Sequence, residues 1–190
     1  MPPIELCFAA SAKHYTRVVE ALEERFAETV ETQPEILAHH CTQARLITKA
    51  VNYLRRAGEL AAKRSATTGA IAQFRKGLDL LHGLPDNSQR RSQELELCVA
   101  LGGALMAAKG FAAKETGEAW EQARELCRQL SETSQLPRVL YGQYVFHLVR
   151  AELAAAFDVG TELLELGRQR RDTDLPVMGH RAVGNASFQL

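Results

Sequence analysis

Residues 48–85 carry two apolar stripes joined by a short polar loop, and this pattern constrains the fold more than any other stretch. The first stripe repeats at intervals of four, three and four residues and the second at three, four and three; the members are Ala50, Leu54, Ala57 and Ala61, then Ile71, Phe74, Leu78 and Leu81. Such spacing places apolar side chains on one face of an α-helix. The loop 65–69 contains serine, threonine and glycine, which favour a turn. The stretch therefore predicts two helices folded back on each other.

Small residues stand where these two predicted helices must cross. Gly58 has no side chain and Ala70 has only a methyl group. Helix axes can then approach to roughly 8–9 Å. We expect Thr67 or Thr68 to cap the second helix. We expect segment 82–85 to end it, because its glycine suits a left-handed cap and its proline cannot continue a helix.

The same plan recurs along the chain. Aligning the small-residue position of each first helix gives Gly58, Gly102, Tyr144 and Gly184, at spacings of 44, 42 and 40 residues. One helical hairpin per repeat is typical of a stacked solenoid rather than a closed bundle. We therefore predict an all-α fold, an α-α superhelix of antiparallel helical hairpins with about eight or nine helices. The residues predicted to pack where helices cross are Leu54, Gly58, Ala70, Phe74, Gly102, Trp120, Ala123, Tyr144, Ala156 and Gly184.

The pattern divides the chain into three parts. Residues 1–12 are predicted to be a poorly determined lead, residues 13–47 an N-terminal helical pair, and residues 48–190 a run of repeats. Within the pair, Thr32 with Glu35 is expected to form a capping box ahead of a helix. The repeats are predicted to span 48–85, 86–135, 136–174 and, in part, 175–190.

Charge and cysteine content exclude several classes of protein. The formal net charge is zero, so the chain lacks the long-range field of most nucleic-acid or anionic-membrane binders. The longest uncharged run, 97–108, is far shorter than the ~20 residues a membrane span needs. The four cysteines are scattered without a Cys-x-x-Cys pair. Free thiols in a reducing cytoplasm are therefore favoured over disulfides.

No group of residues predicts catalysis or metal binding. His39, His40 and Cys41 are adjacent, but neighbouring helical residues diverge by about 100°, and a helical chelate would need ligands at i and i+4. His40 is instead expected to pack at a helix crossing, and His147 to be a hydrogen-bonded core histidine. The glycines near 102–110 do not match a phosphate-binding loop. We predict no catalytic, cofactor-binding or metal-binding residue, no cofactor, and no enzymatic activity in this stretch.

The first hairpin resembles a known repeat. Leu54, Ala57, Gly58, Ala61, Ala70, Phe74 and Gly77 resemble the tetratricopeptide (TPR) framework, in which a glycine faces a small residue twelve positions later. The repeat spacing here exceeds the 34 residues of a standard TPR. Longer helices or loops are therefore expected, and HEAT-like or otherwise irregular hairpin repeats are the alternative.

Longer runs resemble one bacterial family. Segment 22–40, which contains ETQPEILAHH, and segments 57–59, 101–110, 123–127 and 148–153 are similar to the region after the ATPase module of large multidomain proteins. In that family a class III adenylate/guanylate cyclase domain precedes a STAND-type ATPase, and TPR-like repeats follow. The resemblance covers roughly residues 16–190. It implies a regulatory arm within a longer protein. It does not imply cyclase activity here, because the catalytic residues of the family lie in other domains.

In a TPR stack the first helices line the concave surface, which predicts a partner-binding groove. Its candidate residues are Asn52, Arg55, Glu59, Glu96, Met106, Arg138, Tyr141, Arg181 and Asn185. Arginine, asparagine and aromatic groups together suit an extended peptide or an acidic segment, although a merely solvated groove fits as well. The expected partner is a protein or peptide, such as the parent protein's own ATPase or cyclase domains, and neither nucleic acid nor membrane. An oligomer is left open, and the alternative function is the ligand- or partner-sensing arm of a STAND-type transcription regulator.

Overall fold

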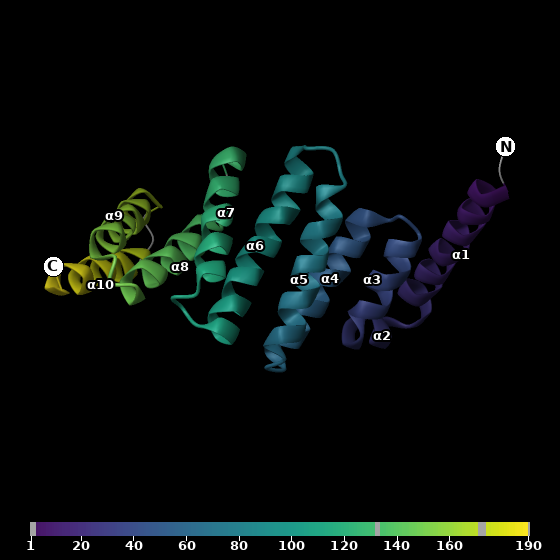
Figure 1. Cartoon of the computed structure of the whole chain (residues 1–190), viewed down its shortest axis with the longest axis horizontal. Helices are drawn as coiled ribbons and strands as arrows, with labels where there is room; N and C mark the ends of the chain where they lie inside the picture. Colours follow the sequence, from purple (N-terminus) through teal and green to yellow (C-terminus); the bar gives the residue numbers. More distant parts are fainter. Residues whose placement is uncertain (1–2, 132–133, 171–173, 190) are drawn as a thin grey trace. The chain divides into compact units, whose positions relative to one another are not determined.

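All the regular structure in the described part of the chain is α-helical (Figure 1). The computed structural model describes the backbone of residues 3–131, 134–170 and 174–189, and no β-strand occurs in these ranges. The helices are α1 (Pro3–Arg25), α2 (Ala27–Thr32), α3 (Pro34–Gln43), α4 (Ile47–Lys63), α5 (Thr67–His82), α6 (Ser88–Lys109), α7 (Lys114–Leu130), α8 (Leu136–Val149), α9 (Leu153–Arg170) and α10 (Asp174–Gln189). The all-α prediction is confirmed, with ten helices in the described residues instead of eight or nine.

The chain divides into two compact units. Unit 1 is Met1–Asp86 and contains α1 to α5; unit 2 is Asn87–Leu190 and contains α6 to α10. The division lies one residue beyond the predicted boundary between the first repeat, 48–85, and the second, 86–135. Each of the predicted stretches 48–85, 86–135 and 136–174 contains two helices.

The beginning of the chain differs from the prediction. Helix α1 starts at Pro3, so most of the expected lead 1–12 is helical. The alanine-rich sequence of this segment has good intrinsic helix propensity. The pair of helices predicted over residues 13–47 is three helices in the structure, because α1 ends at Arg25, where Phe26 leaves helical geometry with φ −127° and ψ 54°, and the short α2 precedes α3. Neither glycine nor proline marks this break, so the sequence pattern does not reveal it.

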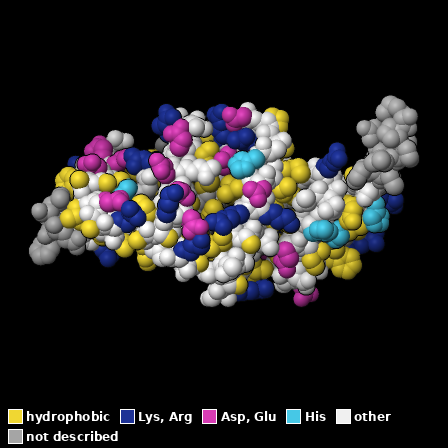
Figure 2. All heavy atoms as spheres, viewed as in Figure 1, with side chains coloured by type: hydrophobic (Ala, Val, Ile, Leu, Met, Phe, Trp, Pro, Cys, Tyr) yellow, Lys and Arg dark blue, Asp and Glu magenta, His cyan; other side chains and the backbone are white. Residues whose placement is uncertain are grey.

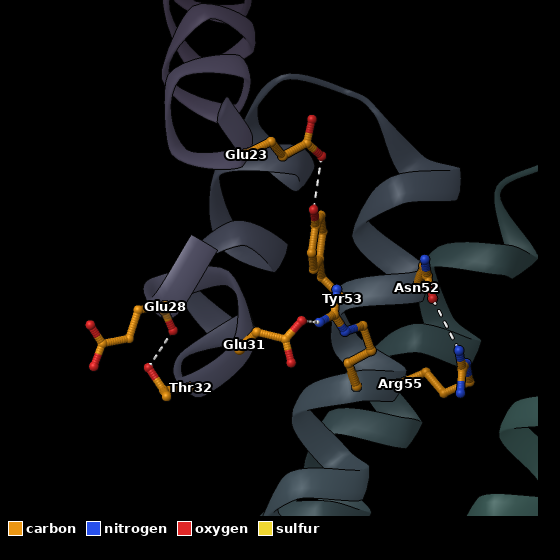
Figure 3. A network of polar contacts seen from close by, with 8 residues as sticks. Glu23, Glu28, Glu31, Thr32, Asn52, Tyr53 and Arg55 are labelled. Carbon is orange, nitrogen blue, oxygen red and sulfur yellow. Dashed lines mark hydrogen bonds and ion pairs between the residues drawn. The ribbon is translucent and has the colours of Figure 1, made fainter. Parts of the chain in front are cut away.

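The helix caps correct two predictions in unit 1. Thr32 does not cap α3; it is the last residue of α2, and its hydroxyl donates a hydrogen bond of 2.7 Å back to the Glu28 carbonyl (Figure 3). The residue at the α3 N-cap is Gln33, which makes no side-chain capping bond. At α5 the N-cap is Ala66, because Thr67 is already helical. All three candidate capping residues, Thr32, Thr67 and Thr68, therefore lie inside helices.

Turn geometry corrects a further prediction. Gly83 follows α5 with φ −81°, so it is not a left-handed cap. Left-handed residues occur instead after α3, α4, α7 and α8, at Arg45, Ser65, Ser131 and Ala151. After α6 the turn uses Gly110, with φ 93°.

The core of unit 1 forms where α3, α4 and α5 pack in succession and α1 lies on α3. Its buried cluster comprises Val19, Leu37, Ala38, Cys41, Ala50, Tyr53 and Leu54. Between α4 and α5, the bare backbone of Gly58 lies against the ring of Phe74. A β-carbon at Gly58 would lie within 3.0 Å of three atoms of that ring. The glycine therefore lets the two helices come close around an aromatic side chain.

Unit 2 packs its helices in chain order, and α8 also contacts α6 and α10. Trp120 of α7 is only 3% exposed and lies between Gly102 of α6 and Gly142 of α8. A β-carbon at either glycine would lie 3.0 Å or less from three ring atoms of the tryptophan. A second buried cluster joins the last three helices: Leu140, Tyr144, Ala156, Val159, Leu163 and Ala182.

Two predicted packing positions take different roles. Tyr144 is buried, but the close approach in its helix is made by Gly142, two residues earlier. Gly184 is exposed, and a β-carbon there would meet nothing within 4 Å, so its predicted packing role is wrong. Between α9 and α10 the close approaches are made by Gly160 and Gly179. The other predicted packing residues Leu54, Ala70, Phe74, Trp120, Ala123 and Ala156 are buried.

The three cysteines whose side chains are described are not in disulfides. Cys41, Cys98 and Cys127 are free and buried; Cys7 has no described side chain. Burial raises the pKa of Cys41 to about 11 and that of Cys98 to about 12.

Within the described ranges, no helix combines the length and the apolar composition needed to cross a lipid bilayer.

Two glycines of unit 2 make a matched pair for testing the packing. We expect Gly142→Ala to lower the free energy of unfolding by about 1–3 kcal/mol, because the added methyl group collides with Trp120. We expect Gly184→Ala to leave stability unchanged or raise it by up to about 1 kcal/mol, because alanine is the better helix former. Urea unfolding followed by circular dichroism measures both. Equal effects of the two substitutions would contradict the assignment.

Candidate partner-binding surface

Three of the predicted groove residues share one face of α4 in unit 1. Asn52 is exposed, and Arg55 and Glu59 are half-buried. The Arg55 guanidinium donates to the Glu59 carboxylate and, at 3.2 Å, to Asn52 Oδ1. Figure 3 shows the bond between Arg55 and Asn52. These three side chains therefore form one hydrogen-bonded row along the helix.

The predicted residues of α6 and the start of α8 lie separately in unit 2. Glu96 is exposed and Met106 is half-buried on α6. Arg138 is exposed on α8, with its guanidinium beside Gly103 of α6; a β-carbon at that glycine would lie 3.7 Å from Arg138 Nη2. None of the three lines a hollow described in this unit.

The remaining three predicted residues come together in one hollow between α8 and α10. It has a volume of about 380 Å³, and we call it the α8/α10 hollow. Its lining residues are Phe111, Tyr141, Tyr144, Val145, Leu148, Met178, Arg181 and Asn185. Helix α8 supplies positions 141, 145 and 148, which recur at helical spacing on one face. The α8/α10 hollow is therefore built by two helices that contact each other directly.

One polar group of the α8/α10 hollow, the Asn185 amide, is held by a hydrogen bond to a buried tyrosine. Asn185 Nδ2 donates a hydrogen bond of 3.3 Å to the hydroxyl of Tyr144, which is only 4% exposed. The rings of Tyr144 and Tyr141 lie 6.1 Å apart between centroids. Arg181 is exposed and makes no hydrogen bond or ion pair with another described residue. The wall thus presents one guanidinium and one oriented amide beside apolar groups.

Sequence reasoning missed most of the apolar wall. Val145 and Leu148 follow Tyr141 at helical spacing, so the α8 stripe could have been extended to them. Phe111 directly follows the Gly110 turn and is 46% exposed. An aromatic residue in such a turn belongs to no helical stripe, so helical periodicity does not predict its role. Met178 lies on α10, where the repeat spacing selected Gly184 as the packing residue. The register of α10 was therefore wrong, and Met178 was not recognised.

A larger cleft of about 840 Å³ lies along α7 and α9 and contains none of the predicted groove residues. Its two arginines are already paired within the fold. Arg124 donates to the Glu162 carboxylate and, at 2.9 Å, to Gln143. Arg128 pairs with Glu125 at 2.6 Å, and hydrogen bonds from Arg128 and Gln129 lower the pKa of Glu125 to about 2. We therefore favour the smaller α8/α10 hollow as the candidate site.

Unit 1 contains a polar network that ties α1 and α2 to α4 (Figure 3). Glu23 accepts hydrogen bonds of 2.8 Å from both Lys49 and the Tyr53 hydroxyl, and Arg56 donates to Glu31 at 3.1 Å. Burial alone would raise the pKa of Glu23, but these hydrogen bonds and the Lys49 charge outweigh it, and the pKa is lowered. Burial and the bond to Glu23 raise the pKa of Tyr53 to about 12. The network therefore has a structural role.

Three histidines and a tyrosine gather between α1 and α3. The Tyr15 ring lies 5.9 Å from His14, 6.5 Å from His39 and 5.6 Å from His40, and the rings of His39 and His40 lie 5.5 Å apart. His40 Nδ1 is buried without a hydrogen-bond partner among the described residues. Burial lowers the pKa of His40, and the charges of His39 and His14 lower it further. His40 thus packs where α1 and α3 meet, in surroundings that favour the neutral form of its ring.

In the part of the chain that the structure describes, no three histidine, cysteine, aspartate or glutamate side chains are arranged to hold a metal ion. His147 is half-buried and pairs with Glu152 at 2.7 Å through Nδ1.

No protein-family model, curated protein or solved structure matches this chain. The resemblance to cyclase–STAND proteins therefore stays a prediction.

The environment of His40 predicts how acid affects stability. Because its pKa is lower in the folded chain than in the unfolded chain, unfolding takes up a proton below the ordinary histidine value of about 6.5. Stability is then fully present above that pH and falls as the pH drops, by at most about 1.4 kcal/mol per pH unit for one proton.

Urea unfolding at pH 7, 6 and 5 tests this expectation. The His40→Phe variant keeps an aromatic ring and should lose less stability between pH 7 and 5 than the unsubstituted chain. The exposed His82 provides a control, and His82→Gln should follow the unsubstituted chain. Parallel pH profiles for His40→Phe and the unsubstituted chain would show that His40 is not the responsible group.

Proposed function

We propose that this chain is a non-catalytic protein-interaction module that binds a peptide segment of a partner in the α8/α10 hollow. The observation that carries the proposal is the composition of that hollow. Apolar and aromatic side chains line it together with an oriented amide and a guanidinium. Peptide-recognition sites combine apolar pockets, which accept side chains, with polar groups that read the backbone.

Helix packing in unit 2 supports a TPR-like arrangement. The first helices of successive hairpins, α6, α8 and α10, contact one another in sequence. In a solenoid of helical hairpins such contacts line up the first helices along one surface. Tyr141 and Arg181 lie on this series of helices, as a concave binding surface requires.

The proposed role is regulatory. The resemblance of segments such as 22–40 and 101–110 to cyclase–STAND proteins supports a repeat arm of a bacterial, cytoplasmic adenylate cyclase-type signalling protein. In that setting the bound segment belongs to a partner or to the parent protein's own ATPase or cyclase domains. Among the described residues that line the α8/α10 hollow, the titratable groups are two tyrosines and Arg181, a set without a nucleophile–base pair.

Surface charge favours a protein partner over a nucleic acid. The formal net charge is zero. On the face shown in Figure 2, positive and negative side chains lie next to one another. Binding to the phosphate backbone instead depends on clustered lysine and arginine.

Selection from a random linear peptide library on the immobilised chain tests the function. We expect enriched peptides, once synthesised, to bind with a measurable Kd by fluorescence anisotropy. Tyr141→Ala combined with Met178→Ala should weaken binding at least about tenfold, a loss of about 1.4 kcal/mol. Val149→Ala removes an exposed apolar residue of α8 outside the α8/α10 hollow and should have no effect. Failure to enrich any peptide, or equal binding by all variants, would contradict the proposal.

A further inference from the structure

We propose that the α8/α10 hollow recognises an extended segment in which an aspartate or glutamate side chain stands next to a bulky apolar side chain. This inference rests on the proposed function and specifies the chemistry of the partner.

The expectation that the bound segment carries a bulky apolar side chain follows from the residues that line the α8/α10 hollow. Val145 and Leu148 of α8 and Met178 of α10 line the α8/α10 hollow, and Phe111 and Tyr141 add aromatic surface. The volume of about 380 Å³ lies near the lower end of the roughly 300–1,000 Å³ that binding pockets span. A hollow of this size suits one or two large side chains. Their burial would contribute the main favourable free energy.

The expectation that the bound segment carries an aspartate or glutamate follows from the charge of the lining residues. Among the eight described lining residues, Arg181 is the only lysine, arginine, aspartate or glutamate, so the described wall has a guanidinium and no carboxylate. A guanidinium binds a carboxylate through two parallel hydrogen bonds. A lysine or arginine in the segment would be repelled by the like charge of Arg181.

The extended conformation follows from the amide of Asn185. Its Nδ2 donates to the Tyr144 hydroxyl, which fixes the orientation of the amide. A primary amide has a second N–H and two acceptor lone pairs. The structure describes no other bond to this amide, so these groups remain to pair with a peptide backbone. An extended segment exposes backbone N–H and C=O groups for such pairing, whereas a helix uses them internally.

The cleft along α7 and α9 does not compete for an acidic segment. Glu118, Glu121, Glu125 and Glu162 line it, and its arginines pair with two of these glutamates. An added carboxylate there would have to displace existing ion pairs. Charge therefore assigns the acidic segment to the α8/α10 hollow.

Short acetylated and amidated peptides that differ at one position test the chemistry. Each has a leucine, followed by glutamate, glutamine or lysine, within the same glycine–serine flanks. We expect the glutamate peptide to bind at least about fivefold more tightly than the glutamine peptide, and the lysine peptide to bind most weakly. Raised salt should reduce the preference, because screening weakens exposed charge pairs.

Charge reversal in the chain provides the decisive comparison. Arg181→Glu should invert the order, so that the lysine peptide binds more tightly than the glutamate peptide. Arg168→Gln changes an exposed arginine of α9 outside the α8/α10 hollow and should preserve the original order. Circular dichroism checks that both variants remain helical.

The outcomes separate this inference from the proposed function. Binding of all three peptides with no preference, or a preference that survives Arg181→Glu, would overturn the acidic chemistry and leave peptide binding intact. Tighter binding of an otherwise neutral peptide with a free C-terminal carboxylate would show that the anion is a chain end, which also overturns it. Absence of binding by every peptide, including those selected from the library, would overturn the proposed function itself.

Discussion

The contact of a large aromatic ring with bare glycine backbone is the interaction on which the packing of this chain depends. Trp120 makes it twice, against Gly102 and Gly142, and thereby joins α6, α7 and α8. Each ring atom gains only a small dispersion energy, but a whole indole at contact distance on both sides gains a large sum. Trp120 Nε1 is buried without a hydrogen-bond partner among the described residues. An unmade hydrogen bond of this kind costs about 1–3 kcal/mol, so packing has to outweigh it.

This packing determines which part of α8 is available to a partner. Gly142 turns toward Trp120, and Tyr144 joins the buried cluster with α9 and α10. The face carrying Tyr141, Val145 and Leu148 is then left beside α10. Gly160 and Gly179 allow α10 to pack closely on α9. The candidate site is therefore a consequence of small residues at the crossings rather than a separate feature.

Periodicity predicted the helical hairpins well, because helix length and turn composition are local properties. It failed where the neighbouring helix decides the outcome. Alignment by period placed Tyr144 at the crossing, although a glycine stood two residues earlier and faced the preceding helix α7. It likewise selected Gly184, although the glycines that lie against the opposite helix are Gly160 of α9 and Gly179 of α10. A repeat spacing counts residues along the chain and does not identify the helix that each residue faces.

The candidate site was predictable in part for the same reason. Tyr141, Arg181 and Asn185 lie on first helices, so helical register was enough to place them on one surface. Phe111 lies in the turn after Gly110 and Met178 on the last helix, and their approach depends on how α8 and α10 pack. The capping predictions failed because Thr32 and Thr67 remain inside helices that extend further than their local motifs suggest.

Proton NMR measures the central contact most directly. If the indole of Trp120 lies on Gly102 and Gly142, ring currents will shift the α-protons of both glycines upfield, and Trp120→Leu will return both to ordinary values. Ordinary shifts for these protons in the unsubstituted chain would show that the tryptophan does not join α6, α7 and α8.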